Sequence, residues 1–488
     1  MVPCKLWNCF KAMMPRTRDP EIQAKASLFH VVVTDRSAAH RLHVGGAAAG
    51  AFSDRPPSVV PSAVLSRRRH YNINSAPYGP LWRAMRRNLT SELFHPSRLR
   101  LYAPARHRAL GDLVADLDRQ RSASSAAGGG VVPAAESLRA AMFGLMSTMC
   151  FGGGVDSELV KAMADAQDDL VQCFLGLRVF ATLPAITGLI FRHRWRKLVD
   201  LRQQQEEMYL PLIDARRRDR RPDRSRDGEP PAYVDTLVDL RVPDEHAIGD
   251  GRSSDRRMKR RRKLNDGELV GLCSEFVGAG TEPAAAVLQW IMANLVKRPD
   301  VQRAGRRSTP PWTRTPVRSA TRLLQGYSTS TLSSWKGSGF TPPYQWSAGV
   351  LIINKVMAGD HVVVDGRRLP AGTAVLFPLD ILAQDKTAWA DPLELRPERF
   401  MTGGEGEGVS LVAAAGSAGE MRMMPFGTGR LHLAYFVANL VREFEWMEAD
   451  GDHAVDLRPH VGFFTVMQRP LRARLVRRRR QANPLGWD

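Results

Sequence analysis

The chain has 488 residues, 43% of them hydrophobic, which is enough to bury a large core in one or two domains. Its net charge of +20 comes from short runs of arginine and lysine without interleaved aromatic residues, which argues against a nucleic-acid-binding protein. Five scattered cysteines argue against a disulfide framework and favour a reducing compartment.

The first 25 residues are predicted to be poorly ordered. They contain neither a signal peptide nor an apolar run of the length that a bilayer requires, so the chain as written is expected to be cytoplasmic or peripherally bound to a membrane. The main domain is expected at 26–476. Its first predicted elements are a strand at 28–33, rich in β-branched residues, and a short helix at 35–40.

Helical periodicity dominates the part of the chain that follows. It predicts helices at 80–93, 98–117, 137–149, 159–180 and 195–217. Between 218 and 262 the chain is rich in charge, Pro and Gly, which predicts a long exposed basic linker. We interpret this linker and the basic tail at 477–488 as solvated, with a surface that faces a membrane or a protein partner as the second interpretation.

The strongest helix of the sequence is predicted at 266–297, with Asp266 as its N-cap and Pro299 as its stop. Strands are predicted at 359–370 and 374–377, a helix at 431–444 and a last strand at 463–467. Helices therefore predominate and the strands are few. The predicted fold class is mainly α (α+β), with many helices and small β-sheets.

Two segments place polar side chains where a bound group could use them. Trp82 and Arg86 are four residues apart in a predicted helix, so the indole and the guanidinium lie on one face, although an amphipathic surface helix explains the pair equally well. Within the long helix, the segment 276–284 combines small residues with an acid, Glu282. Gly280 precedes this acid and Pro283 follows it.

Two further segments lie nearer to the C-terminus. One is Pro-Glu-Arg-Phe at 397–400, which contains Glu398 and Arg399. The other, 424–430, is a glycine-rich loop that runs from Met424 through Phe426 to Arg430. Taken together and in this order, the four segments resemble plant microsomal cytochromes P450, and the resemblance extends from about residue 26 to 476.

The resemblance implies a cytochrome P450 fold, a haem cofactor and monooxygenase activity: hydroxylation of a small apolar substrate with O2 and electrons from NADPH-cytochrome P450 reductase. Trp82, Arg86 and Arg430 would contact the haem propionates, and Phe426 would begin the haem-ligand loop. Gly280 and Glu282 would belong to the oxygen pocket. Arg399, next to Glu398, would lock onto a Glu-x-x-Arg pair in the K helix. Members of the family usually reside in the endoplasmic reticulum membrane.

The chain departs from the family at the iron ligand. Counting from Phe426 places the ligand cysteine at 433, where the chain has Leu433. The simplest explanation is a deletion of about ten residues after Arg430. The thiolate promotes O–O cleavage, so its loss removes the chemistry. His432 is a weak substitute because it belongs to an ordinary helix motif, and Pro283 replaces the threonine that delivers protons.

The Glu-x-x-Arg pair is also missing, because no acidic residue occurs between Asp300 and Asp360. The segment Ser-Ser-Trp-Lys-Gly-Ser-Gly at 333–339 equals a one-base shift of codons for Val-Val-Leu-Glu-Gly-Leu-Arg. We therefore predict a frame-shifted segment at 303–346, which originates from a gene lesion or from wrongly drawn exon boundaries. The fold is expected to be disrupted at the K helix and at the haem-ligand loop.

These observations predict a haem-thiolate monooxygenase by descent that is impaired or inactive as written, and they put haem binding in question. Two alternatives remain open at this point. One is a non-catalytic haem-binding protein that uses His432, and the other is a degenerate, pseudogene-type product.

Overall fold

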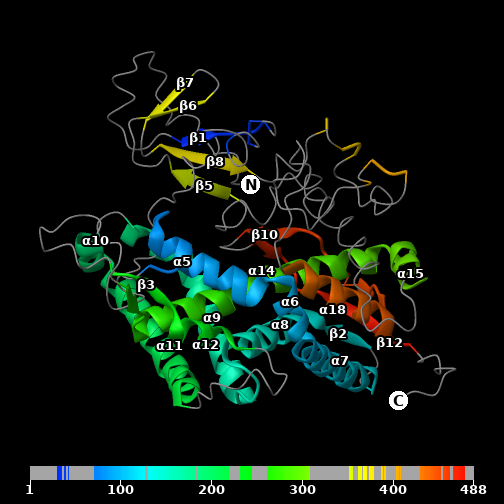
Figure 1. Cartoon of the computed structure of the whole chain (residues 1–488). Helices are drawn as coiled ribbons and strands as arrows, with labels where there is room; N and C mark the ends of the chain where they lie inside the picture. Colours follow the sequence, from blue (N-terminus) through cyan, green and yellow to red (C-terminus); the bar gives the residue numbers. More distant parts are fainter. Residues whose placement is uncertain are drawn as a thin grey trace, which may run out of the picture.

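The fold is taken from a computed structural model of the chain (Figure 1), in which helices predominate and the strands form small sheets. The structure describes residues 30–35, 38–39, 42, 71–126, 130–181, 184–218, 231–244, 261–307, 351–355, 361–364, 367–370, 373–378, 386–387, 389–391, 403–405, 407, 429–451, 454–461 and 465–478. The predicted fold class is confirmed.

The first half of the described chain is almost entirely helical. Its helices are α5 (Pro80–Leu89), α6 (Pro96–Leu101), α7 (Ala103–Ala126), α8 (Ala134–Phe151), α9 (Ser157–Leu177), α10 (Pro184–Ile190) and α11 (Arg192–Arg218), with a π-helical turn η1 (Thr90–Phe94) and a 3-10 turn η2 (Arg178–Ala181). The single helix predicted at 98–117 is wrong, because the chain divides it at Tyr102. This side chain is buried and donates a hydrogen bond to the carbonyl of Pro231 at 2.6 Å.

The second half of the described chain contains fewer helices, and one of them, α14, is long. They are α12 (Tyr233–Asp239), α14 (Asp266–Lys297), α15 (Pro299–Arg307) and α18 (Gly429–Glu443). The N-cap of α14 is Asn265 and not Asp266 as predicted: its side chain accepts from the Glu268 backbone at 3.0 Å, and the Glu268 carboxylate accepts from the Asn265 backbone at 2.8 Å. Pro283 lies inside α14 and does not end it.

Part of the predicted exposed linker at 218–262 is buried, so the prediction is wrong for residues 231–244. Tyr233, Val234 and Leu237 of α12 are almost completely inaccessible, and Asp235 accepts a hydrogen bond from Arg216 of α11 at 2.8 Å. Strands β3 (Arg241–Pro243) and β4 (Arg261–Lys263) then pair antiparallel. A short apolar segment inside a charged stretch was enough to dock on the helices. Residues 219–230 and 245–260 lie outside the described residues.

The strands form small sheets around the helices. Strand β8 (Ala374–Pro378) pairs parallel with β1 (His30–Val32) and antiparallel with β5 (Leu351–Lys355). The strand predicted at 359–370 is a hairpin of β6 (His361–Val364) and β7 (Arg367–Pro370).

A second three-stranded sheet combines segments that are far apart in the chain. In it, β12 (Arg472–Arg477) lies between β2 (Val131–Pro133) and β9 (Phe444–Met447). Strands β10 (Pro459–Val461) and β11 (Thr465–Met467) form a hairpin. Arg477, assigned above to a solvated tail, ends β12 and pairs with Glu443 at 3.0 Å, so the tail begins later than predicted.

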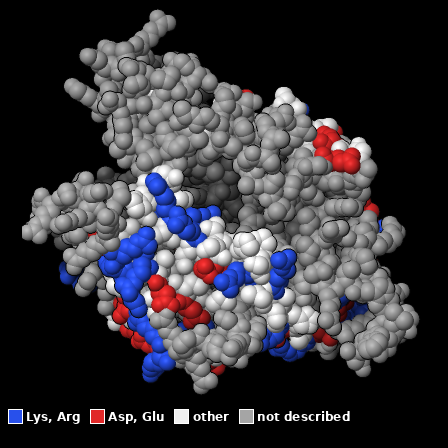
Figure 2. All heavy atoms as spheres, viewed as in Figure 1, with Lys and Arg blue, Asp and Glu red and all other residues white. Residues whose placement is uncertain are grey.

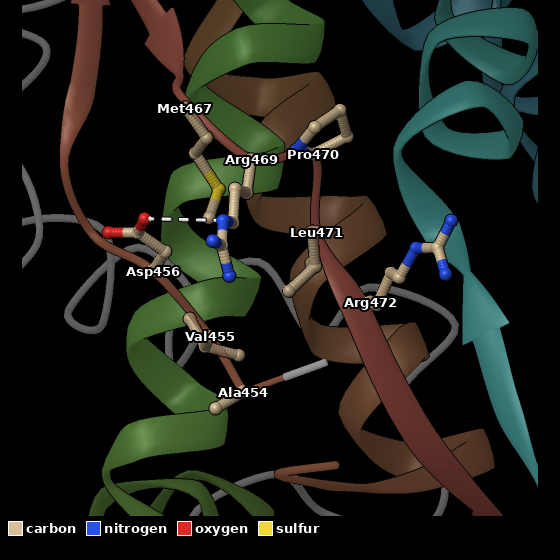
Figure 3. A pocket seen from close by; sticks show the side chains of 8 residues that line it. All are labelled: Ala454, Val455, Asp456, Met467, Arg469, Pro470, Leu471 and Arg472. Carbon is tan, nitrogen blue, oxygen red and sulfur yellow. Dashed lines mark ion pairs between the residues drawn. The ribbon is translucent and has the colours of Figure 1, made fainter. Parts of the chain in front are cut away.

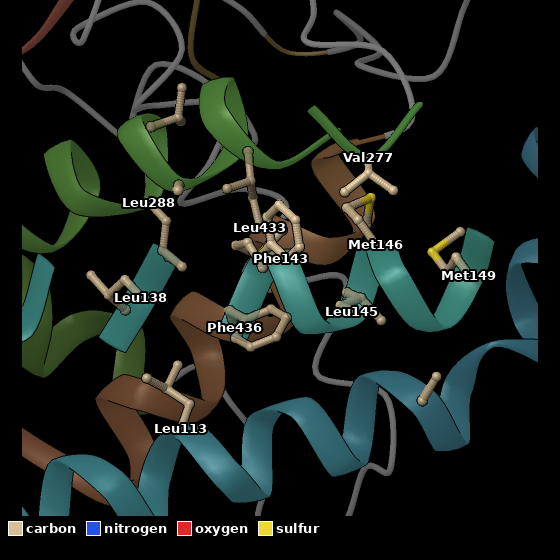
Figure 4. Close-up of a cluster of buried hydrophobic side chains, with 14 of the residues drawn as sticks. Leu113, Leu138, Phe143, Leu145, Met146, Met149, Val277, Leu288, Leu433 and Phe436 are labelled. Atoms are coloured by element: carbon tan, nitrogen blue, oxygen red, sulfur yellow. The ribbon is translucent and has the colours of Figure 1, made fainter. Parts of the chain in front are cut away.

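Four helices supply the centre of the main hydrophobic core. Leu113 of α7, Phe143 of α8, Leu288 of α14 and Phe436 of α18 converge there and are almost fully buried (Figure 4). Burial of each such side chain contributes about 1.5–3 kcal/mol to folding. A smaller cluster between α9, η2 and α11 contains Leu170, Phe180, Leu198 and Leu201. The core is therefore built from apolar residues that recur at helical spacing in the sequence.

The described surface is rich in basic side chains. Figure 2 shows a band of lysine and arginine over the part of the molecule where Figure 1 places α11. None of the described helices combines the length and the apolar composition that a membrane span needs.

Candidate functional site

A cavity of about 490 Å³ lies beside the strands at the C-terminal end of the described chain (Figure 3). It is lined by Ala454, Val455, Asp456, Met467, Arg469, Pro470, Leu471 and Arg472. The Asp456 carboxylate lies 3.9 Å from Arg469 across it, and a hydrogen bond from Arg458 lowers the pKa of Asp456 below its ordinary value. None of the residues that the sequence predicts for the site lines this cavity. The site predicted from the sequence therefore has to be traced along α14, α5 and α18.

Helix α14 holds the predicted oxygen-pocket residues, and its glycines permit close packing. A Cβ atom built on Gly280 would lie 2.5 Å from the sulfur of Met146 on α8, and one on Gly278 would overlap the Gln167 side chain of α9. Gly280 therefore faces α8, where only a hydrogen atom fits. The structure places Gly280 in the contact between α14 and α8, and not on the face of α14 that carries the exposed residue Ala279.

Glu282 is held by Arg139 of α8. The Arg139 guanidinium donates to the Glu282 carboxylate at 2.7 Å and to the carbonyl of Ala164 at 3.2 Å, and it lies 3.8 Å from Asp168 of α9. The Glu282 side chain is only 12% exposed. Burial alone would lower the pKa of Arg139, but the hydrogen bond with Glu282 and the neighbouring carboxylates outweigh it and raise that pKa above its ordinary value. Sequence reasoning missed Arg139, because nothing in the chain links positions 139 and 282.

The open side of α14 is lined by small residues. Ala279 is exposed, and Pro283 and Ala286, four and seven residues further on, are partly exposed. Thr281 carries a hydroxyl in this turn, but it is fully buried and its oxygen has no hydrogen-bond partner. Two residues along a helix correspond to about 200° of rotation, so Thr281 faces away from Ala279. The open side therefore offers no hydroxyl at positions 279–286.

Helix α5 carries the predicted propionate donors, Trp82 and Arg86. The indole N–H of Trp82 donates to the carbonyl of Ile73 at 3.1 Å. The Ile73 backbone N–H in turn donates to Glu275 of α14 at 2.9 Å, so this chain of hydrogen bonds ties α5 to α14. Arg86 is exposed and has no ion-pair partner among the described residues. Of the predicted pair, Arg86 is thus the one with donors available for an anionic group.

Helix α18 contains position 433, at which the iron ligand was counted. Leu433 is 2% exposed and belongs to the same buried cluster as Phe143 of α8 (Figure 4). A side chain at this position points into the helical core. The counted position is therefore a packing position of α18. Arg430 is the second residue of α18, and Phe426, Glu398 and Arg399 lie outside the described residues.

His432 is also buried, at 4% exposure, and its Nδ1 has no hydrogen-bond partner. Burial, together with the nearby Arg106 cation of α7, lowers the pKa of His432 to about 3. Its imidazole is therefore neutral near pH 7. Arg106 itself donates to the carbonyl of Leu99 at 2.7 Å. His432 lies in the contact between α7 and α18.

The described cysteines lie on other helices. Cys150 of α8 and Cys273 of α14 are buried, and Cys173 lies on α9. Burial and then the contact with Cys273 raise the pKa of the Cys150 thiol well above its ordinary value. A haem-thiolate site requires a thiolate at the iron. The described residues supply a cation, Arg86, but no thiolate on α18, so they do not fit a thiolate-ligated haem.

The comparisons with known proteins agree on one family. The family model described as cytochrome P450 matches residues 27–307 and 350–473. Cytochrome P450 89A9 of Arabidopsis thaliana is 34% identical over 469 residues, which cover 92% of this chain and 84% of that protein. Flavonoid 3'-monooxygenase CYP75B3 of Oryza sativa subsp. japonica is 25% identical over 430 residues, which cover 86% and 77%.

Solved structures show the same fold. A structure of zebra fish cytochrome P450 with progesterone matches with a TM-score of 0.68 and 18% sequence identity, and the match covers 98% of this chain and 100% of that one. A second zebra fish cytochrome P450 structure, with abiraterone, has a TM-score of 0.65 and 19% identity. At these identities the likeness concerns the fold alone.

Proposed function

The chain belongs to the cytochrome P450 family, and from this premise we propose that it descends from haem-thiolate monooxygenases but does not activate oxygen through a thiolate-bound iron as its sequence stands. Members of the family carry haem, receive electrons from a redox partner and act on small organic molecules. The ancestral activity that we infer is hydroxylation of a small apolar substrate, with electrons from an NADPH-dependent reductase.

One observation carries this proposal: the buried leucine at position 433. The family's ligand loop leads directly into the helix that α18 represents, and here Leu433 already belongs to the packed face of that helix. Replacing Leu433 by cysteine would therefore place a thiol in the core. The loss concerns a whole loop, and no single substitution in α18 repairs it.

The residues of α14 that were predicted to form the oxygen pocket support the same proposal. Proton delivery to a bound oxygen requires a hydroxyl or a carboxyl at the open face of α14. Pro283 has neither, Glu282 is engaged by Arg139, and the Thr281 hydroxyl faces away. The alternative that His432 ligates the iron is disfavoured by its burial against α7.

The gap in the family match supports the predicted frame shift. The two matched segments leave out residues 308–349, which overlap the predicted shifted segment 303–346. Sequencing the transcript distinguishes the two origins. A transcript that encodes 303–346 as printed means a lesion in the gene, whereas a transcript with a conventional K helix means that exon boundaries were drawn wrongly.

The proposal is tested by haem spectroscopy on the full chain. The purified protein is mixed with haem, reduced and exposed to CO, and Arabidopsis cytochrome P450 89A9 treated in the same way is the positive control. We expect the control to show the long-wavelength band of a thiolate-bound haem and this chain to lack it. A thiolate-type band from this chain would overturn the proposal.

A second variant addresses the histidine alternative. If the chain shows a haem band of the imidazole type, His432→Gln is compared with His107→Gln, which alters an exposed histidine on the adjoining helix. Loss of the band in the first variant only would establish His432 as a ligand. Equal spectra from both variants would exclude it.

A further inference from the structure

Two fully buried cysteines lie in the main hydrophobic core, Cys150 on α8 and Cys273 on α14. After burial, the neighbouring Cys273 thiol is the next cause of the raised pKa of Cys150, so the two thiols are close together. The proposed function uses neither of them and does not depend on them. A buried cysteine commonly packs as a small apolar residue, but two adjacent thiols on different helices can also be joined by a covalent bond.

The relative direction of α8 and α14 is given by contacts in their middle parts. The Arg139 guanidinium of α8 donates to the Glu282 carboxylate of α14 at 2.7 Å. Met146, seven residues later in α8, packs on Gly280, which lies two residues earlier in α14. The contacts move toward the start of α14 as α8 advances, so the two helices run antiparallel.

The same antiparallel register leads to the two thiols. Figure 4 shows Met146 and Val277 where α8 and α14 meet, and both belong to the main buried cluster. One helical turn further, Cys150 follows Met146 by four residues and Cys273 precedes Val277 by four. Residues four apart share one face of a helix, so the two cysteines lie on the sides of α8 and α14 that face each other.

The close approach of these helices suits a disulfide. Gly280 leaves no room for a Cβ atom against Met146, which places α8 and α14 among closely packed helix pairs. The axes of packed helices are about 8–10 Å apart and Cα atoms lie about 2.3 Å from each axis, so facing Cα atoms are about 3.4–5.4 Å apart. A disulfide joins Cα atoms that are about 4.4–6.8 Å apart. Residues that face each other in this contact therefore lie within reach of such a bond.

Aromatic side chains enclose the pair of thiols. Phe151 follows one cysteine directly and packs edge-on against Tyr209 of α11, with ring centroids 5.3 Å apart. Phe276 follows the other cysteine by three residues and packs against Tyr233 of α12, with ring centroids 4.9 Å apart. Bulky reagents are kept out of such an enclosed position, whereas hydrogen peroxide is nearly as small as water. The oxidant that fits this place is therefore a small, uncharged one.

We propose that Cys150 and Cys273 form a reversible disulfide that joins α8 to α14 when the chain is exposed to a hydroperoxide. The thiolate of one cysteine attacks the peroxide and breaks its O–O bond, which leaves a sulfenic acid and releases water. The second thiol attacks the sulfenic sulfur, forms the S–S bond and releases a second water molecule. The two thiols lose two electrons and the peroxide gains them. Exchange with a reduced dithiol reverses the step.

The test uses the full chain with Cys4→Ser, Cys9→Ser and Cys173→Ser combined, so that only the pair of thiols remains. The folded protein is treated with hydrogen peroxide, digested without reduction and analysed by mass spectrometry. We expect a peptide in which Cys150 and Cys273 are cross-linked, and we expect dithiothreitol to separate it into two. Absence of the cross-linked peptide would overturn the proposal.

Thermal unfolding distinguishes a bond formed in the folded chain from one formed in unfolded molecules. A native disulfide that closes so long a loop should raise the midpoint temperature of unfolding by about 5 °C or more, and dithiothreitol should reverse the shift. Adding Cys150→Ala to the same chain gives the matched control, which should show no peroxide-dependent shift, and Cys273→Ala should behave in the same way. A cross-link without the shift, or the same shift in either control, would overturn the proposal.

Discussion

The contact between α8 and α14 and the outer face of α10 use the same kinds of residue in opposite ways. In the α8–α14 contact, Phe143 and Leu288 are buried and Gly280 lets the helices approach closely. On α10, Leu189 and Ile190 are exposed to solvent, and Gly188 packs against the ring of Trp195. Apolar side chains thus stabilise the fold in the first region and remain exposed to solvent in the second.

The difference bears on how the scaffold and the proposed site relate. The helical core is held by apolar side chains of four helices, α7, α8, α14 and α18. The proposed loss of function concerns a loop before α18 and a hydroxyl in α14, whereas Leu433 and Phe143 are both buried in the core. The predictions below test this separation, from the largest expected effect to the smallest.

The largest effect is expected for Phe143→Ala in the core. Phe143 is fully buried, so the substitution should lower the free energy of unfolding by about 3–5 kcal/mol. The matched change Leu189→Ala, on the exposed face of α10, should alter it by less than about 0.5 kcal/mol. Urea unfolding followed by circular dichroism measures both, and similar losses would refute the comparison.

Acid should weaken the contact between α7 and α18 through His432. Its pKa is lowered to about 3 in the folded chain, so on acidification the unfolded chain takes up this proton first. Stability from this group is complete above the ordinary pKa near 6.5 and falls by about 1.4 kcal/mol per pH unit as the pH drops from there toward 3.

The control for this effect is His432→Gln, which cannot titrate. Its unfolding free energy should lose the part of the pH dependence between pH 6 and 4 that belongs to the histidine, whereas carboxylates contribute equally to both proteins. Parallel pH profiles for the two proteins would mean that His432 is accessible to protons in the folded chain.

The ion pair between Arg139 and Glu282 should contribute less. Removing either partner leaves a largely buried charge, but Arg139 is 27% exposed, so solvent screening reduces the cost to about 1–2 kcal/mol. Arg139→Met, Glu282→Gln and the double variant form a cycle that yields the coupling energy from urea unfolding. Additive effects of the two single changes would show that the pair does not couple α8 to α14.

The smallest effect is expected at the start of α14. Asn265→Ala removes the side chain that caps the helix and should cost about 1 kcal/mol. Asp266→Asn, at the position favoured by the sequence pattern, should cost less than about 0.5 kcal/mol because this residue is exposed and makes only a surface ion pair. Thermal unfolding of both variants decides between the two caps, and a greater loss for Asp266→Asn would contradict the observed geometry.

Regular patterns were the most reliable guide to the fold. The helix at 266–297 was predicted with the bounds that the structure has, because its apolar positions repeat over many turns. Tyr233 and its neighbours were missed because a single turn of apolar residues within a charged stretch has too few repeats to be recognised. For the site, the sequence indicated Trp82, Arg86 and Glu282 but not their partners, since Ile73 and Arg139 lie on other segments.

The sequence by itself determined the family, the helical framework and the absence of a cysteine at the counted position, because these depend on residue types and on local spacing. The tertiary structure decided which way each side chain faces: Leu433 into the core, Glu282 toward Arg139 and Leu189 into solvent. The direction of a side chain depends on contacts between segments that are far apart in the chain, and local spacing carries no information about those contacts.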